Sequence, residues 1–168
     1  MVSETYHNDR AELSAKIFDD ITTPILEWYF DGQVKSTEKH DGTIETWLDK
    51  DCGVDAIVRT KNKIVFGIAH RINKKYYRTF TIHMSRPDEY ITEIDHLRQP
   101  GFKPRYHVQT ACKDGKPVEI AIAKTNDLLY AIDNGLAKIK TSDDGQEFAI
   151  LYWDKLIENG INVDIIKL

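Results

Sequence analysis

Residues 49–71 of this sequence combine three aspartates at their start with two basic residues at their end, a combination that could bind a metal ion and a phosphate group. Asp49, Asp51 and Asp55 precede one apolar run, and a second apolar run ends at His70 and Arg71. Carboxylates are good ligands for Mg²⁺, and a neighbouring cation can bind phosphate. The stretch therefore predicts a metal and phosphate site, although an ordinary hairpin with a solvated rim has the same pattern.

Two strands must position these residues. The runs at 54–60 and 64–71 are apolar on both faces, as in the middle of a covered sheet, and the short turn Lys61-Asn62-Lys63 joins them. In such a hairpin, Arg71 lies either at the sheet edge or in a polar cleft beside Asp55. His70 points to the opposite face of a regular strand, so a core or edge histidine is the better interpretation of that residue.

The rest of the chain supplies helices and further strands. Apolar residues recur every four positions from residue 11 to 29, which predicts an amphipathic helix that Pro24 kinks or interrupts. Residues 76–84 alternate like a strand, and we expect this strand to pair with 64–71 across the turn Asn73-Lys74-Lys75. Further periodicity and turn signals predict helices at 87–97 (with Pro87 in its first turn), 128–132 and 148–157, and strands at 106–112, 118–124 and 163–166.

This order predicts an α/β fold with a central mixed β-sheet flanked by helices. The length of 168 residues, with 41% hydrophobic and 30% charged residues, suits a single domain over residues 1–168. No apolar run reaches the length of a membrane helix, and the first ten residues are polar, so we expect a cytoplasmic protein without a membrane partner. Cys52 and Cys112 lack the spacing of a zinc site, which favours free thiols.

The charge of the chain is segregated. The net charge is −4, yet residues 56–87 contain no Asp or Glu and eight of the 23 basic residues. This distribution favours a phosphate-binding face on an otherwise acidic protein, although a solvated hairpin rich in lysine has the same composition. The candidate nucleic-acid contacts in this stretch are Lys61, Lys63, Arg71, Lys74, Lys75 and Arg78. Tyr76 and Tyr77 could stack on bases, or pack within the protein.

The central stretch resembles the core of the PD-(D/E)XK, or restriction-endonuclease-like, nuclease superfamily. In that family a helix precedes a three-stranded meander, an Asp lies at an end of the second strand, and an acid-x-Lys triplet lies on the third. Here the segment 53–58, with Asp55, resembles the Asp-bearing strand, and the segment 67–71 falls where the triplet is expected. Ala69 occupies the acid position and Arg71 the lysine position.

Further segments extend the resemblance over about residues 48–129. With Asp51-x-x-x-Asp55, the segments Phe80–Ile82, Thr92-Glu93 and Tyr106–Gln109 look like divergent nuclease-like proteins of phages and mobile elements. The resemblance implies a restriction-endonuclease-like core and Mg²⁺ bound by Asp55, with Asp51, Asp49, Glu27 or the Ala69 carbonyl as the second ligand. Glu93 and Gln109 enter as additional site residues only through the resemblance.

The residues present fit this chemistry in part. Arg71 can bind a phosphate through two hydrogen bonds, but it stays protonated and cannot act as a base. Without an acid at Ala69, cleavage is possible but not implied. The leading hypothesis is a metal-dependent nuclease-like protein acting on DNA through Asp55 and Arg71. The alternatives are a catalytically degenerate DNA-binding, regulatory or inhibitory protein of the same fold, which could bind a host protein, and an unrelated α/β domain.

Overall fold

The computed structural model describes residues 12–37, 47–49, 52–85, 87 and 91–168. Residues 12–17 are helical and lead into a π-helical turn. From there on, the elements with their bounds are η1 (Phe18–Thr22), α2 (Thr23–Phe30), β1 (Gly32–Ser36), β2 (Ala56–Thr60), β3 (Val65–Asn73), β4 (Thr79–Ser85), α4 (Glu93–Arg98), β5 (Pro104–Lys113), β6 (Lys116–Lys124), α5 (Thr125–Asp133), β7 (Lys138–Thr141), β8 (Glu147–Tyr152), α6 (Trp153–Glu158) and β9 (Val163–Lys167).

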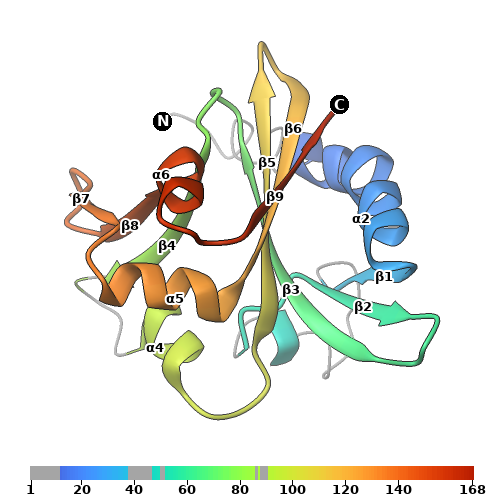
Figure 1. Cartoon of the computed structure of the whole chain (residues 1–168), viewed down its shortest axis with the longest axis horizontal. Coiled ribbons are helices and arrows are strands. Elements are labelled where there is room, and N and C mark those ends of the chain that lie inside the picture. Colours follow the sequence, from blue (N-terminus) through green and yellow to red (C-terminus); the bar gives the residue numbers. More distant parts are fainter. Residues whose placement is uncertain (1–11, 38–46, 50–51, 86, 88–90) are drawn as a thin grey trace, which may run out of the picture.

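A six-stranded mixed sheet runs through the molecule in the order β1-β2-β3-β5-β6-β9 (Figure 1). The first three strands form an antiparallel meander, and β5 pairs with β3 in parallel. The remaining neighbours are antiparallel, with β6 between β5 and β9. The structure therefore confirms an α/β fold with a mixed sheet flanked by helices. It also confirms the hairpin of the second and third strands and the strands now called β5, β6 and β9.

A second sheet of three strands, in the order β4-β8-β7, was not predicted. The prediction that residues 76–84 pair with the strand before them is wrong. These residues do form a strand, but β4 pairs with β8, as in the register Phe80↔Leu151. The prediction of one helix over residues 148–157 is wrong too, because residues 148–152 belong to the strand β8 and only the residues after them form the helix α6. The strand β7 was missed because its sequence, Lys-Ile-Lys-Thr, is short and mostly polar.

The helix predicted at residues 11–29 is present but contains a π-helical turn. The turn η1 ends directly before α2, where Pro24 occupies the first turn. Proline has no N–H to donate and clashes with a carbonyl of the preceding turn, so a widened turn before Pro24 is its expected effect.

The helix α4 begins at Glu93 rather than near Pro87. Its start is fixed by a capping box in which Asp95 Oδ2 accepts hydrogen bonds from the Thr92 backbone N–H and hydroxyl.

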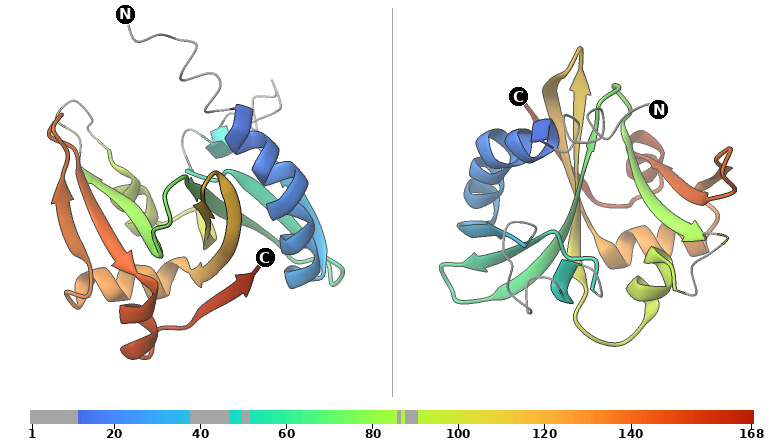
Figure 2. Two further views of the ribbon diagram at one scale, coloured as in Figure 1. Left: turned by 90° about the horizontal axis from the view of Figure 1, so that it is seen from above. Right: turned by 180° about the vertical axis from the view of Figure 1, so that it is seen from behind.

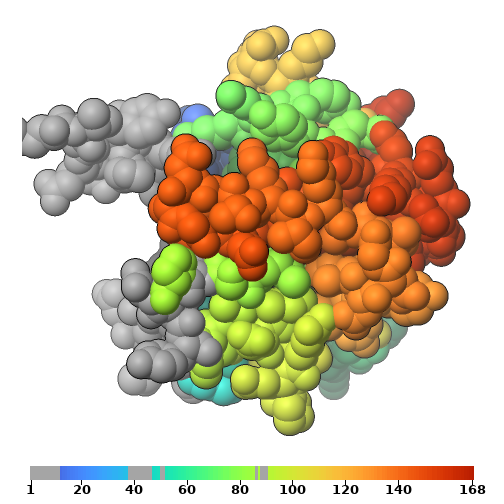
Figure 3. Space-filling view, turned by 90° about the vertical axis from the view of Figure 1, so that its left-hand side faces the viewer, coloured from blue at the N-terminus to red at the C-terminus, as the bar shows by residue number. Residues whose placement is uncertain are grey.

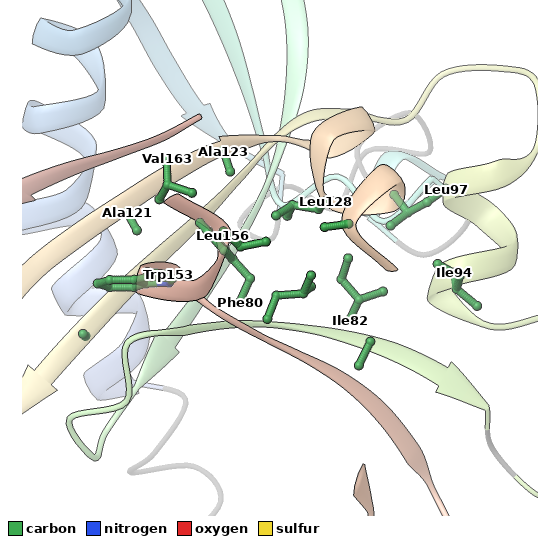
Figure 4. Packing of buried hydrophobic residues seen from close by; sticks show 14 residues of the cluster. Phe80, Ile82, Ile94, Leu97, Ala121, Ala123, Leu128, Trp153, Leu156 and Val163 are labelled. Carbon is green, nitrogen blue, oxygen red and sulfur yellow. The ribbon is translucent and has the colours of Figure 1, made fainter. Parts of the chain in front are cut away.

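Two hydrophobic cores lie on opposite faces of the six-stranded sheet. Alternate residues of β6 divide between them, with Ile120 and Ile122 in the core under α2, and Ala121 and Ala123 in the other. The core that contains Ala121 and Ala123 fills the space between the two sheets, where Trp153 is fully buried (Figure 4). Seen from above in Figure 2, α2 and the three-stranded sheet lie on opposite sides of β5 and β6.

No helix in the described ranges has the length and apolar character needed to span a membrane.

Replacing Phe80 by Ala tests the core between the sheets. Phe80 is 1% exposed and its ring centroid lies 6.0 Å from that of Trp153. The cavity left by Phe80→Ala should lower the free energy of unfolding by about 3–5 kcal/mol, measured by urea denaturation. The control, Ile139→Ala, removes a half-exposed side chain of β7 and should cost about 0.5 kcal/mol or less. Equal effects of the two substitutions would contradict a packed core at Phe80.

Candidate functional site

Asp55 is held where β2 begins, beside the middle of β3. Its backbone N–H donates to the Ile68 carbonyl at 2.9 Å, and its Oδ2 accepts from the His70 backbone N–H at 2.6 Å. These two bonds tie the residue to β3 through its main chain and through its carboxylate. Asp55 also borders hollows on both faces of the sheet, and the larger of them contains the other candidate residues.

Arg71 and Glu93 form an ion pair over this end of β3. Arg71 Nη2 donates to Glu93 Oε2 at 2.5 Å, and the same oxygen accepts from the His83 backbone N–H at 2.8 Å. The Glu93 side chain is only 19% exposed, so water screens this pair less than it would screen a surface pair. One carboxylate therefore joins β3, β4 and α4.

One pocket of about 310 Å³ brings Asp55, Ala69, Arg71 and Glu93 together. Its wall also contains Cys52, Gly53, His83, Ile91, His96, Leu97 and Phe148. Glu93 thus brings a second carboxylate to the pocket, although Ala69 stands at the acid position of the resemblance. His83, His96 and Phe148 were not predicted for the site, because the sequence did not show that β4, α4 and β8 pack around this pocket.

A buried polar pair lies beside these residues on the neighbouring strand. In the parallel register of β3 and β5, His107 is opposite Ala69 and Gln109 is opposite Arg71. Both side chains are buried, and the Nε2 atoms of both lack a hydrogen-bond partner within the described ranges. Burial lowers the pKa of His107 to about 4, while Glu93 acts to raise it and Arg71 to lower it. A neutral imidazole and an amide therefore lie next to the ion pair.

His70 faces the other side of the sheet, as predicted. Its Nε2 lies 3.1 Å from the Thr110 hydroxyl, and its ring centroid lies 4.6 Å from that of Phe18. Burial lowers its pKa from 6.5 to about 3. His70 is thus a half-buried histidine with a hydrogen-bond partner, in agreement with the core or edge position predicted for it.

The basic candidates do not gather on one surface. Lys61 and Lys63 lie in the turn before β3, whereas Lys74 and Lys75 follow its end. At about 3.3 Å per residue, the nine-residue strand separates them by roughly 26 Å. Lys61 forms an ion pair with Asp31.

Arg78 takes part in an ion-pair network between the two sheets. Its guanidinium donates to Glu119 Oε2 at 3.1 Å and to both carboxylate oxygens of Asp154 at 2.6 and 2.8 Å. It also lies over the Trp153 ring, with its Cζ 5.5 Å from the centroid. Since Glu119 is buried, this network gives Arg78 a structural role, and the prediction of Arg78 as a nucleic-acid contact gains no support.

The remaining predicted ligands lie apart from the pocket or outside the described residues. Glu27 Oε1 accepts from the Val34 backbone N–H at 3.1 Å on the side of the sheet covered by α2. The Asp49 carbonyl accepts from the Gly53 N–H in a turn, and the Asp49 side chain is not in the pocket wall. Asp51 lies outside the described residues. Among the residues that the structure describes, no three His, Cys, Asp or Glu side chains form a group that could hold a metal ion.

Comparisons of the chain with protein-family models, with curated proteins and with solved structures gave no match.

The burial of His70 predicts a pH dependence of stability. Because its pKa is about 3 in the folded protein and 6.5 for an imidazole exposed to water, the unfolded chain binds the additional proton between these values. The free energy of unfolding should therefore fall as the pH is lowered from about 6.5 towards 3. In urea titrations over this range, His70→Gln should show a shallower decline than the unsubstituted protein. An identical slope for both proteins would contradict a buried neutral His70.

Replacing Arg78 by Met tests its structural role. The substitution leaves the buried Glu119 carboxylate without its cationic partner, and we expect a loss of about 1–3 kcal/mol in the free energy of unfolding. Arg59→Met, at an exposed position of β2, serves as the matched control and should change stability by about 0.5 kcal/mol or less. Unchanged stability of Arg78→Met together with weaker DNA binding would instead assign Arg78 to the nucleic-acid surface.

Proposed function

We propose that the protein is a divergent nuclease-like protein that acts on DNA phosphodiesters with a divalent metal ion. The observation that carries the proposal is the convergence of Asp55, Arg71 and Glu93 on one pocket from β2, β3 and α4. Two carboxylates and a guanidinium are the groups that metal-assisted phosphodiester hydrolysis uses.

The order of the elements supports the same proposal. A helix precedes the antiparallel meander β1-β2-β3, a crossover with α4 follows, and β5 lies parallel to β3. Asp55 directly precedes the second strand of the meander, and Ala69 and Arg71 lie on the third. The helix, the three-stranded meander, an Asp at an end of the second strand and the triplet position on the third are the features that the resemblance to the restriction-endonuclease-like core implies, and they support the proposal.

The carboxylates of the pocket fit Mg²⁺ better than a metal that requires a complete protein cage. Mg²⁺ commonly binds through one or two carboxylates and keeps several waters, and Asp55 and Glu93 supply two carboxylates. When bound, such an ion lowers the pKa of a coordinated water and polarises the phosphate.

Arg71 is placed to orient the substrate. Its side chain is partly exposed, and its pairing with Glu93 fixes the guanidinium in the pocket wall. A guanidinium binds two phosphate oxygens in a planar arrangement, so Arg71 can bind a phosphodiester next to the two carboxylates. On the adjacent strand, His107 is opposite Ala69 and Gln109 is opposite Arg71, so both residues lie beside the phosphate-binding position.

A second candidate function is DNA binding without cleavage. Ala69 favours this alternative because it removes the acid that the resemblance places on β3, and Glu93 is already paired with Arg71. In that case Arg71 would still bind phosphate, and the fold would serve a regulatory or inhibitory role.

Cleavage assays with two variants test the proposal. The purified protein should cleave plasmid, linear duplex or single-stranded DNA in Mg²⁺ or Mn²⁺. Asp55→Asn and Glu93→Gln should each lower the rate at least ~100-fold, because each removes a carboxylate charge from the pocket. Gel analysis over time measures the rates, and RNA serves as a further substrate.

Glu158→Gln is the matched control, since it removes an exposed carboxylate of α6 away from the pocket. Its rate should equal that of the unsubstituted protein. Cleavage that persists in both pocket variants would assign the activity to another site, whereas no cleavage with any substrate would favour the binding function.

A further inference from the structure

The segment between β3 and β4 presents two exposed tyrosine rings. Tyr76 is 46% exposed and Tyr77 is 55% exposed. Asn73 Nδ2 donates to the Tyr77 carbonyl at 3.2 Å, and the Tyr77 N–H donates to the Lys75 carbonyl at 2.7 Å. The Tyr76 hydroxyl donates to the buried Glu119 carboxylate at 2.8 Å. The Tyr76 side chain and the backbone at Tyr77 are therefore held in place, and both rings are exposed.

Four lysines lie in the same segment as these rings or in the neighbouring hairpin. Lys74 and Lys75 belong to the same segment, and Lys113 and Lys116 lie in the adjacent β5–β6 hairpin, where they are paired with each other in the register. The segment and the hairpin are neighbours because Asn73 is opposite Ala111. Figure 3 shows the two next to one another at the top of the view, the segment in green and the hairpin in yellow.

Few carboxylates offset this positive charge. Asp114, at the tip of the hairpin, is exposed. Glu119 is buried and accepts from both Tyr76 and Arg78, and Asp154 is paired with Arg78. The surface thus combines exposed aromatic rings with an excess of cations in a protein whose net charge is −4.

The surface also adjoins the candidate site. Arg71 lies three residues before Lys74, which is about 10 Å along an extended chain. A polyanion that crosses Lys74 and Lys75 can therefore continue to Arg71 and the pocket.

We propose that this surface, formed by Lys74, Lys75, Tyr76, Tyr77, Lys113 and Lys116, binds single-stranded nucleic acid. The inference rests on the proposed function, because it names the strand that enters the Asp55 pocket. Bases of a single strand can stack on exposed aromatic rings, while lysines along the same path bind the phosphates. In a duplex the faces of the bases are covered by their neighbours, so the tyrosines favour the single strand.

Binding measured without cleavage tests the inference. A fluorescein-labelled oligothymidylate of about sixteen nucleotides is titrated with the protein in EDTA, and anisotropy gives the dissociation constant. Tyr77→Ala should weaken binding by about 5- to 150-fold, the range found for the loss of one stacked base. Tyr77→Phe keeps the ring and should bind like the unsubstituted protein. A duplex of the same length should bind more weakly and respond little to Tyr77→Ala.

The salt dependence tests the lysines separately. Between about 50 and 200 mM salt, Lys74→Glu with Lys75→Glu should reduce the slope of log K against log salt by about 1.4, which corresponds to two lost phosphate contacts on a single strand. Lys138→Glu with Lys140→Glu, at exposed positions of β7 in the three-stranded sheet, should leave the slope unchanged.

Tyr130→Ala is the matched control for the ring, since Tyr130 is 60% exposed and belongs to α5, which lies away from the tip of the β5–β6 hairpin in Figure 1. Binding that is equally weak for Tyr77→Ala and Tyr130→Ala, or unchanged by Tyr77→Ala, would overturn the inference. So would a flat salt response, which points to a protein partner. Cleavage that depends on Asp55 without any effect of Tyr77 would overturn this surface alone, whereas Tyr77-dependent binding without cleavage would overturn only the catalytic proposal.

Discussion

The parallel pairing of β3 with β5 is the constraint on which the candidate site depends. A parallel neighbour cannot be reached by a tight turn, so the chain must leave the end of β3 and return to the start of β5 through residues 74–103. This crossover contains β4 and α4, and it places Glu93 over Arg71. The same pairing brings His107 beside Ala69 and Gln109 beside Arg71. The pocket is thus a consequence of topology rather than of one local motif.

The crossover also explains why the two sheets are held together by both apolar and charged groups. After β3 the chain leaves the six-stranded sheet, and β4 pairs with β8 in the second sheet. The space between the sheets is filled by Phe80, Ile82, Leu151 and Trp153. At the edge of this core, Arg78 joins Glu119 of the large sheet to Asp154 at the start of α6. The network fixes the direction in which the chain leaves β3, and with it the orientation of Tyr76.

The sequence predicted the local elements better than their partners. The β2–β3 hairpin, β5, β6 and the side on which His70 lies follow from alternation and turn signals within short segments. The partner of residues 76–84 could not be found in this way, because alternation identifies a strand but not the sheet that it joins. Residues 148–157 were misassigned because Leu151, Tyr152, Lys155 and Leu156 have helical spacing across the junction of β8 and α6.

Asp55 and Arg71 were found from their places in the hairpin, whereas Glu93 required the resemblance, since by spacing alone it is a helix-surface acid.

The proposed function requires that Asp55 and Glu93 act as one metal site although they come from different elements. Titration with Mn²⁺, followed by the loss of the free-ion electron paramagnetic resonance signal, tests this requirement without relying on cleavage. We predict one binding event that is lost in Asp55→Asn and in Glu93→Gln, with the double variant no weaker than either single variant, because one site cannot be lost twice. Undiminished Mn²⁺ binding in either single variant, or no binding by the unsubstituted protein, would contradict a shared metal site.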